Sequence, residues 1–341
     1  MRLERYPDEL EDLWDDFRRS LARRNRSPAT LEVYRKSFES FWDYALAAGL
    51  PPDPAAVDHR TINRWLDDML TAPVVRNGQV VYDTDPETGE KVPRLVTPST
   101  RRIRFVNLRP FFSWWAKEFE VESPFAKADT PGEDRPTPIP VVEMDDVRTL
   151  IGACKAAYDT AKARKGSPGL KARDQFEARR DEAMIRVLFD TGARLGELLN
   201  LRVVDFDRRQ DRLTLTGKTG TRIVPLSPST AEALSRYLRE RKDHTYAASP
   251  ALWLSRKGAL KESGVAQLLR RRCQEAGINH INPHRFRHTW AHESRSAGVS
   301  EGELMYLAGW KSTAMAHRYG HSAAAARAEA AARRINLGDR L

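Results

Sequence analysis

Apolar residues recur at helical spacing along the first part of the chain. Between residues 8 and 48 the repeat is broken once, at NRSP, where Ser27 and Pro28 form a helix start; Gly49 follows as a plausible stop. This pattern predicts two helices. The same spacing predicts two further helices, at about 58–70 and about 99–119. Residues 1–125 are therefore predicted to form a small helical domain.

The stretch 74–96 interrupts the helical pattern. Its apolar and polar residues alternate around a turn-rich centre, which predicts a β-hairpin insertion. Residues 126–140 are rich in proline and charge and have almost nothing to bury, so we expect a linker there.

The second part of the chain, 141–341, predicts a mainly helical domain with one small β element. Two β-branched runs surround a Gly-Lys-Thr-Gly turn within 211–226, which predicts a hairpin, and a loop is expected over 162–174. The remainder, with its alanine-rich end, is mostly helical in pattern, beginning with the segments 143–157, 179–192 and 197–201. The predicted fold class is α+β: mainly α, with a small β-hairpin or sheet in the second domain.

Length and composition narrow the class of protein. A chain of 341 residues is comfortable for two domains and can bury a sizeable core. Cys154 and Cys273 are isolated and follow no metal-ligand spacing, which fits a reducing compartment. The charged start lacks the apolar stretch of a signal peptide, and no uncharged apolar run reaches membrane-spanning length. We therefore expect a soluble cytoplasmic protein.

The charge is unevenly distributed. The net charge is +10, with 22 Lys/Arg against 27 Asp/Glu in residues 1–150 and 35 against 20 in residues 151–341. This excess of positive charge favours a nucleic-acid partner. Basic residues also cluster within the acidic first part: Arg18, Arg19, Arg23, Arg24 and Arg26, then Arg101, Arg102, Arg104 and Arg109. Each cluster is either a DNA-binding face or an ordinary solvated helix face.

The stretch TGARLGELLNL holds the first polar residue in an unusual place. Arg194 opens a helix after a glycine turn, and Glu197 follows one turn later. An arginine at a helix N-terminus opposes the helix dipole, so anion binding is one explanation of its position. Structural pairing with Glu197 is the other.

The hairpin stretch LTGKTGTRIVPL places Lys218 at its tip. A phosphate-binding loop would need a glycine five positions before Gly217, and position 212 is arginine, so that motif is excluded. A lysine at a hairpin tip can extend toward a substrate as an acid. It can equally be an ordinary turn residue.

The stretch NPHRFRHTWAHES contains His284, His288 and His292 at intervals of four. A zinc-protease motif would need Glu directly after the first His of its pair, but Thr289 follows His288, so zinc binding is not favoured. His284 and Arg287 instead place an imidazole and a guanidinium one turn apart. Together these groups suit a phosphate, because the guanidinium binds two oxygens and the imidazole transfers a proton.

The stretch WKSTAMAHRYGH places Tyr319 among cations and imidazoles, nine positions after Trp310. In this order and context, six residues closely resemble those of the tyrosine recombinase family, also called phage integrases: Arg194, Lys218, His284, Arg287, Trp310 and Tyr319. The resemblance covers about residues 141–325. Residues 8–125 look more loosely like the family's helical core-binding domain, which implies a two-domain DNA clamp.

The sequence departs from the family pattern in several places. Position 310 is more often histidine in the family, and the indole of Trp310 can donate a hydrogen bond but cannot shuttle a proton. The stretches 74–96 and 162–174 are longer than usual. A separate N-terminal arm-binding module is expected to be missing.

The resemblance implies a reaction without metal or other cofactor. Tyr319 would attack a DNA phosphate and form a covalent 3′-phosphotyrosine, with His284 as the base. Arg194 and Arg287 would hold the non-bridging oxygens, and Lys218 would protonate the leaving oxygen. Trp310 would add a hydrogen bond, and the residues expected to brace the arginines are Glu197 and His288.

The resemblance also implies partners. The protein would clamp double-stranded DNA, using Arg18, Arg19, Arg23, Arg24, Arg101, Arg102 and Arg104, and would act as a homotetramer. The tail 322–341 would dock on a neighbouring subunit or pack on its own domain. Two alternatives stay open at this point. A type IB topoisomerase would use the same chemistry without strand exchange, and a DNA-binding regulator would keep the fold without catalysis.

Overall fold

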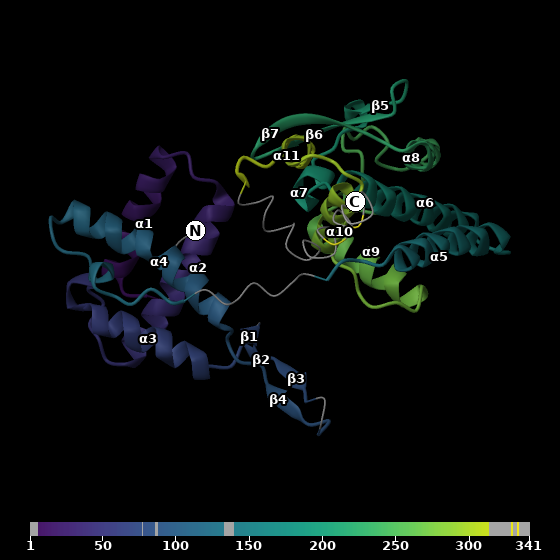
Figure 1. The fold of residues 1–341 in the computed structure, drawn as a ribbon. Helices are drawn as coiled ribbons and strands as arrows, with labels where there is room; N and C mark the ends of the chain where they lie inside the picture. Colours follow the sequence, from purple (N-terminus) through teal and green to yellow (C-terminus); the bar gives the residue numbers. More distant parts are fainter. Residues whose placement is uncertain are drawn as a thin grey trace, which may run out of the picture. The chain divides into compact units, whose positions relative to one another are not determined.

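The computed structural model of the chain describes residues 6–76, 78–85, 88–132, 140–313, 329 and 333. The chain divides into two compact units, Met1–Thr137 and Pro138–Leu341. Each unit is mainly helical, and the strands form small antiparallel sheets (Figure 1). The predicted α+β fold class is confirmed. In the described part of the chain, no helix is both long enough and apolar enough to cross a membrane.

The first unit contains the four predicted helices: α1 (Asp8–Arg23), α2 (Pro28–Ala47), α3 (His59–Thr71) and α4 (Pro98–Glu118). Local sequence explains their starts. The side chains of Ser27, Asp58 and Thr97 each accept a hydrogen bond from the backbone N–H three residues later, which satisfies a donor that the helix leaves unpaired. Pro28 and Pro98 occupy the first helical positions, where the missing N–H carries no cost.

Aromatic side chains fill the core of the first unit. Phe38 and Phe111 lie edge to face with ring centroids 4.8 Å apart, and Phe41 meets Trp65 in the same manner at 5.4 Å. These rings come from different helices, so the interlocking geometry fixes how α2, α3 and α4 pack.

The insertion at 74–96 differs from the prediction, because it forms two successive hairpins where one was expected. In the first, β1 (Val75–Arg76) pairs with β2 (Gln79–Val80); in the second, β3 (Tyr82–Thr84) pairs with β4 (Lys91–Pro93). The reason is that the stretch contains two turns. The chain reverses at Gly78 (φ +76°) and again at Gly89 (φ +73°).

The start of the predicted linker 126–140 is attached to the first unit. The Asn63 amide donates to the Asp129 carboxylate at 2.6 Å, and the Asp129 backbone N–H returns a hydrogen bond to Asn63 at 3.0 Å. Arg102 donates to the carbonyl oxygen of Pro131. These contacts place 126–131 against α3 and α4. The domain limits themselves stay a prediction.

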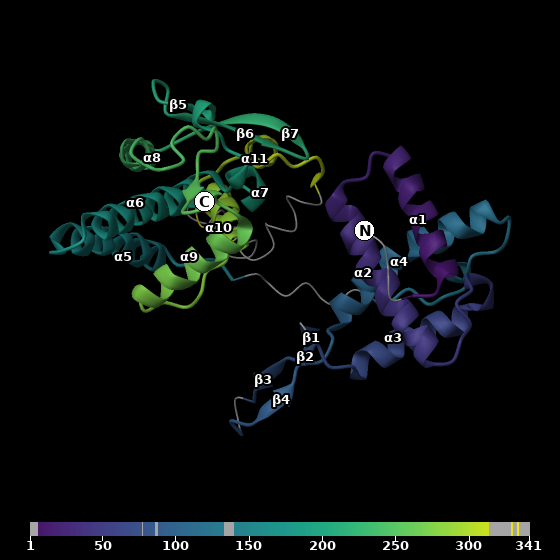
Figure 2. The ribbon, with the colours of Figure 1, turned by 180° about the vertical axis from the view of Figure 1, so that it is seen from behind.

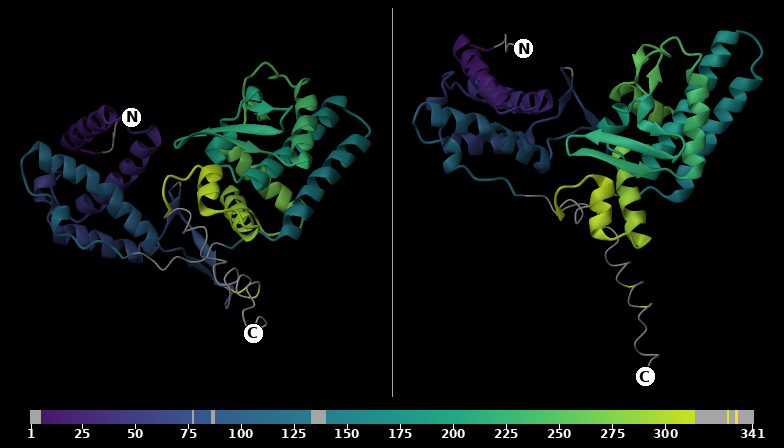
Figure 3. Two further views of the ribbon diagram at one scale, coloured as in Figure 1. Left: turned by 45° about the horizontal axis from the view of Figure 1, so that its top comes forward. Right: turned by 90° about the horizontal axis from the view of Figure 1, so that it is seen from above.

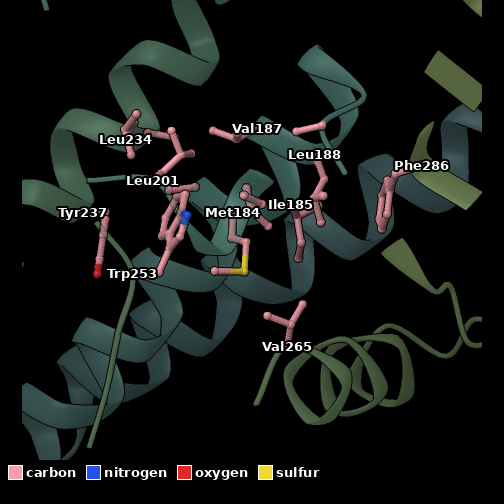
Figure 4. Close-up of a cluster of buried hydrophobic side chains, with 14 of the residues drawn as sticks. Met184, Ile185, Val187, Leu188, Leu201, Leu234, Tyr237, Trp253, Val265 and Phe286 are labelled. Carbon is pink, nitrogen blue, oxygen red and sulfur yellow. The ribbon is translucent and has the colours of Figure 1, made fainter. Parts of the chain in front are cut away.

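The second unit is built around α6 (Pro168–Thr191), which packs against α5 (Met144–Ala163), α8 (Pro228–Arg241) and α10 (Pro283–Ser296) (Figure 1). Figure 4 shows its core, in which Met184 and Leu188 of α6 lie between Tyr237 of α8 at one end and Phe286 of α10 at the other. Seen from behind, α9 (Glu262–Glu275) lies along α5 (Figure 2).

The loop predicted over 162–174 is mostly helix, so the expectation of a long loop there is wrong. Helix α5 continues to Ala163 and α6 already starts at Pro168, leaving a short connection. Proline at the first position is set for helix entry, and the residues after it are good helix formers apart from Gly169. Ion pairs from Arg164 and Arg173 to Asp174 further stabilise this turn.

The β element of the second unit is a three-stranded antiparallel sheet. The predicted hairpin is β6 (Arg212–Gly217) and β7 (Gly220–Pro225), seen at length in Figure 3, and the short β5 (Phe206–Asp207) adds to its edge. The unit is completed by the remaining short elements: α7 (Leu195–Leu199), β8 (Leu254–Ser255), β9 (Gly258–Ala259) and α11 (Glu301–Ala308). Of the predicted tail 322–341, only Glu329 and Arg333 are described, and they form an ion pair at 2.5 Å.

Candidate active site

The turn between α6 and α7 positions the first predicted catalytic residue. Gly192 caps the C-terminus of α6 in the left-handed region, at φ +57°, and Arg194 is the N-cap residue of α7, directly before Leu195. The Arg194 backbone N–H donates to the Glu197 carboxylate at 2.9 Å, and its Nη1 donates to the same carboxylate at 2.8 Å. The predicted pairing therefore exists. It still leaves the Arg194 side chain 33% exposed, so this guanidinium can also reach a ligand.

Glu197 is buried and is shared by two arginines. Besides Arg194, the guanidinium of Arg222 on β7 donates to both of its carboxylate oxygens, at 3.0 and 2.9 Å. Burial by itself would raise the pKa of Glu197, but the hydrogen bonds from Arg222 and from the Arg194 backbone outweigh it and hold that pKa at about 2. The carboxylate therefore stays ionised at neutral pH and fixes the position of Arg194.

The two predicted catalytic arginines converge on the end of α11. Arg287 donates from Nη2 to the Ala308 carbonyl oxygen at 2.7 Å, and Arg194 Nη1 lies 3.4 Å from the same oxygen. Arg194 Nη2 also reaches the Gly309 carbonyl at 3.3 Å. One acceptor oxygen is thus approached by two guanidiniums from different helices, which is an arrangement suited to an anion with several oxygens.

Arg287 differs from Arg194 in its exposure. It is only 1% exposed, and its Nη1 donates to the Gly192 carbonyl at 2.7 Å, so it ties the α6–α7 turn to the end of α11. Its guanidinium carbon also lies 5.3 Å from the ring centroid of Trp310, a cation–π distance. In this structure Arg287 therefore binds backbone carbonyls.

The tip of the β6–β7 hairpin lies close to Arg194, and Gly217, Thr219 and Gly220 make this approach possible. Lys218 is exposed at the tip, and the hydroxyl of the next residue, Thr219, lies 3.5 Å from Arg194 Nη1. A side chain at Gly217 would approach Glu197 to 2.9 Å, and Gly220 has φ +118°. The Gly-Lys-Thr-Gly sequence thus combines a close approach with a left-handed turn, and it places Lys218 beside the arginine site.

Helix α10 carries the predicted His284 and His288. The Asn282 side chain caps the helix by accepting from the Arg285 N–H at 3.0 Å. His284 is exposed, His288 is buried one turn later, and their rings meet edge to face with centroids 4.7 Å apart. His288 therefore supports His284, and bracing of an arginine by His288 stays a prediction. The described residues hold no group of three or more His, Cys, Asp or Glu side chains that could bind a metal ion.

Trp310 is buried and packs with Ala291, Leu304 and Ala308. Its ring is therefore part of the local core and also lies beside Arg287. The predicted nucleophile Tyr319 lies outside the described residues, as do its neighbours. The structure therefore brings together Arg194, Glu197, Arg287, Trp310 and the Lys218 hairpin.

Comparison with known proteins decides the family. Residues 143–326, more than half of the chain, match the model described as the phage integrase family. The chain belongs to the phage integrase family. It is 26% identical over 346 residues to the tyrosine recombinase XerC of Roseiflexus sp. (strain RS-1), with 96% of each chain covered. It is also 26% identical over 317 residues to the tyrosine recombinase XerA of Saccharolobus solfataricus, covering 92% of this chain and 90% of that one.

Solved structures show the same fold. The XerH site-specific recombinase bound to its palindromic difH substrate, in a post-cleavage complex, has a TM-score of 0.63 at 18% identity, with 91% of this chain and 81% of that one covered. A lambda integrase tetramer bound to a Holliday junction has a TM-score of 0.57 at 17% identity, with 89% and 77% covered. The phage integrase family member described here is thus a tyrosine recombinase, an enzyme that breaks and rejoins DNA strands.

The predicted DNA-binding arginines of this recombinase fall into two groups. Several already have protein partners, namely Arg18 with Asp15, Arg19 with Asp16, Arg101 with Asp67 and Arg102 with the Pro131 carbonyl. Arg23 and Arg24 at the end of α1 are exposed and have no ion-pair partner within the described chain. Burial lowers the pKa of Arg104, against a smaller opposing effect of Glu39. Arg23, Arg24 and Arg104 thus have the least compensated charge.

Arg222 was not predicted, although the sequence contains a signal for it. Along β7, the residues that alternate toward the core are Arg222 and Val224, followed by Leu226. A charged residue at an inward position of a strand requires a buried partner of opposite charge. That partner is Glu197, which lies in a different element and which the strand pattern cannot identify.

Proposed function

We propose that this recombinase is site-specific, cutting and rejoining DNA at defined sites through a covalent 3′-phosphotyrosine at Tyr319, and that it integrates or excises a mobile element such as a prophage. The observation that supports this proposal most strongly is the convergence of Arg194 and Arg287 on one oxygen, that of Ala308. Two guanidiniums directed at one acceptor match the non-bridging oxygens of a phosphodiester.

The reaction follows from the roles of five side chains. The Tyr319 oxygen attacks the phosphorus, the bond from phosphorus to the 5′ oxygen breaks, and Lys218 gives that oxygen a proton. His284, which is exposed, takes the proton of the phenol, whose ordinary pKa near 10 requires a base at neutral pH. Arg194 and Arg287 stabilise the charge on the non-bridging oxygens. The 5′ hydroxyl of a partner strand then gives its proton to Lys218 and attacks the phosphotyrosine. The bond from phosphorus to the Tyr319 oxygen breaks, and His284 returns its proton to the phenol.

Arg287 requires a rearrangement to take this role. Its guanidinium is buried and donates to the carbonyls of Gly192 and Ala308. A phosphate oxygen can replace the Ala308 carbonyl as acceptor only if the end of α11 moves. We therefore propose that DNA binding shifts the segment from Ala308 through Trp310, which leads toward Tyr319.

The two predicted domains, 1–125 and 141–341 with the linker 126–140, would grip the duplex as a clamp. Their uncompensated charge supports Arg23, Arg24 and Arg104 as phosphate contacts. An arginine that already binds a carboxylate or carbonyl must first give up that partner, which offsets part of the free energy gained by binding phosphate. Strand exchange needs two duplexes, so we propose a homotetramer on DNA, with the tail 322–341 docking on a neighbouring subunit. Such an enzyme would work in the bacterial cytoplasm, on the nucleoid when bound to DNA.

The proposal is tested by capturing covalent adducts. Purified protein is incubated in EDTA with fragmented genomic DNA of its source organism and stopped with denaturant. The DNA that stays attached to protein is then sequenced. We expect recovery of one short shared sequence with the wild type and none with Tyr319→Phe. Tyr306→Phe is the matched control, since Tyr306 is 66% exposed on α11 and should be dispensable.

Each other outcome points to a different activity. Adducts without a shared sequence, together with relaxation of supercoiled plasmid by a monomer, would indicate a type IB topoisomerase. DNA binding without any adduct would indicate a regulator. Adducts that persist in Tyr319→Phe would show that another residue is the nucleophile.

A further inference from the structure

Arg222 has the contacts of a residue that organises the proposed active site. It lies on β7, is 6% exposed, and uses both terminal nitrogens on Glu197. Its Nε donates to the Leu307 carbonyl of α11 at 2.6 Å. One side chain therefore joins the hairpin that carries Lys218, helix α7, which Arg194 caps, and α11.

Neighbouring residues leave little freedom for this arrangement. A side chain at Gly309 would come within 2.9 Å of Arg222 Nη1 and within 3.2 Å of the Thr219 hydroxyl. A side chain at Gly217 would come equally close to Glu197. The Arg222–Glu197 pair is thus enclosed by backbone on two sides, so a substitute cannot shift to restore the lost hydrogen bonds.

Charge gives the pair a second consequence. Glu197 faces two charged groups, Arg194 on its own helix and Arg222 on β7, and the three together carry one net positive charge. Without Arg222, Arg194 and Glu197 would form a neutral pair. The attraction of Arg194 for a phosphate would then be largely cancelled, and Glu197 would have only one guanidinium to orient it.

On the basis of the proposed function, we propose that Arg222 is a positioning residue for strand cleavage: it binds Glu197 and thereby keeps Arg194 both oriented and positively charged toward the DNA phosphate. It acts through Glu197 and does not contact the substrate. This role differs from that of Lys218 on the same hairpin, which gives a proton to the leaving oxygen.

The first test separates cleavage from DNA binding. Single-turnover adduct formation is measured on a nicked duplex carrying the sequence recovered by adduct capture. We expect Arg222→Met to form adduct about 100-fold more slowly, the scale of a misplaced catalytic group, with a much smaller loss of DNA affinity, because one phosphate contact is a small part of the binding to duplex DNA. Arg222→Lys keeps the charge but not the paired hydrogen bonds, so it should recover part of the rate.

The second test asks whether Arg222 acts through Glu197. If it does, the double variant Glu197→Gln with Arg222→Met should cleave no more slowly than Glu197→Gln alone. Losses that multiply in the double variant would overturn the proposal, as would wild-type cleavage by folded Arg222→Met.

A merely structural role is distinguished by a control and by pH. Arg241 is similarly buried and donates to backbone carbonyls after α8, so Arg241→Met should lower stability without slowing cleavage by the folded protein. In Arg222→Met the pKa of Glu197 should rise from about 2 toward its ordinary value. Because the cleavage rate in acid also depends on His284, the proposed base, this rise is measured through the stability of the protein.

The stability of the protein gives a readout that needs no DNA site. As the pH falls, Arg222→Met should lose less stability than the wild type, because the pKa of Glu197 is lowered less in the variant. Equal acid sensitivity would overturn the coupling between the two residues. Failure of the proposed function would look different, since the wild type itself would then form no adduct.

Discussion

Gly192 connects the fold to the arginine site, and replacing it with alanine tests that connection. The residue adopts φ +57°, and its carbonyl accepts from Arg287 at 2.7 Å. A Cβ added at this position would lie 2.4 Å from the ring of Trp290. Gly192→Ala therefore combines a backbone penalty with a steric clash at the point where α6 turns into the active site.

The two costs can be estimated separately. A left-handed conformation costs an L-residue about 1–2 kcal/mol. Insertion of a methyl group into a packed site costs about 1–3 kcal/mol, since the Trp290 ring must move. The sum is about 2–5 kcal/mol. At roughly 2–4 °C per kcal/mol for a unit of this size, the melting temperature should fall by roughly 4–20 °C.

Differential scanning calorimetry of the full chain measures this change, because two units that unfold separately give separate transitions. Gly152→Ala is the matched control. Gly152 lies inside α5 with open space around its Cβ position, so alanine there should stabilise by about 0.5–1 kcal/mol. Combining Gly192→Ala with Trp290→Ala should cost less than the sum of the two single changes. A Gly192→Ala protein that melts within a degree of the wild type would refute the reasoning.

Two further predictions concern charge. The pKa of Glu197 is about 2 in the folded protein, below its ordinary value of 4.5. The ionised carboxylate therefore adds about 3 kcal/mol to the free energy of unfolding. This contribution is fully present above pH 4.5 and is lost as the pH falls toward 2. Acid unfolding curves measure this loss. Glu197→Gln should remove the loss of stability between pH 4.5 and pH 2, so curves of the same shape for the wild type and Glu197→Gln would contradict the prediction. Arg24→Gln should weaken DNA binding and reduce the slope of log affinity against log salt by about one, whereas Arg102→Gln should leave the slope unchanged because Arg102 binds Pro131. DNA-binding titrations at several salt concentrations measure both slopes. Equal slopes for Arg24→Gln and Arg102→Gln would contradict the assignment of Arg24 as a phosphate contact.

The sequence by itself determined the elements with strong local signals. Ser27 with Pro28 marks the start of α2, and the glycines around Lys218 mark the hairpin turn, because capping and turn chemistry act within a few residues. The family motifs likewise pointed to Arg194 and Arg287 as catalytic residues, a role that stays a prediction. The prediction was wrong at 74–96, where two turns follow each other although the pattern indicated a single hairpin. It was also wrong at 168–174, where glycine and charged residues suggested a loop although the segment is helical.

Only the tertiary structure decided how these residues act on one another. The meeting of Arg194 and Arg287 at Ala308, and the sharing of Glu197 with Arg222, join residues from separate helices and strands. A sequence pattern shows that Arg222 points inward but cannot show which carboxylate it meets. The physical reason is that burial makes an unpaired charge costly wherever it lies, while the identity of its partner depends on which elements the packed core brings together.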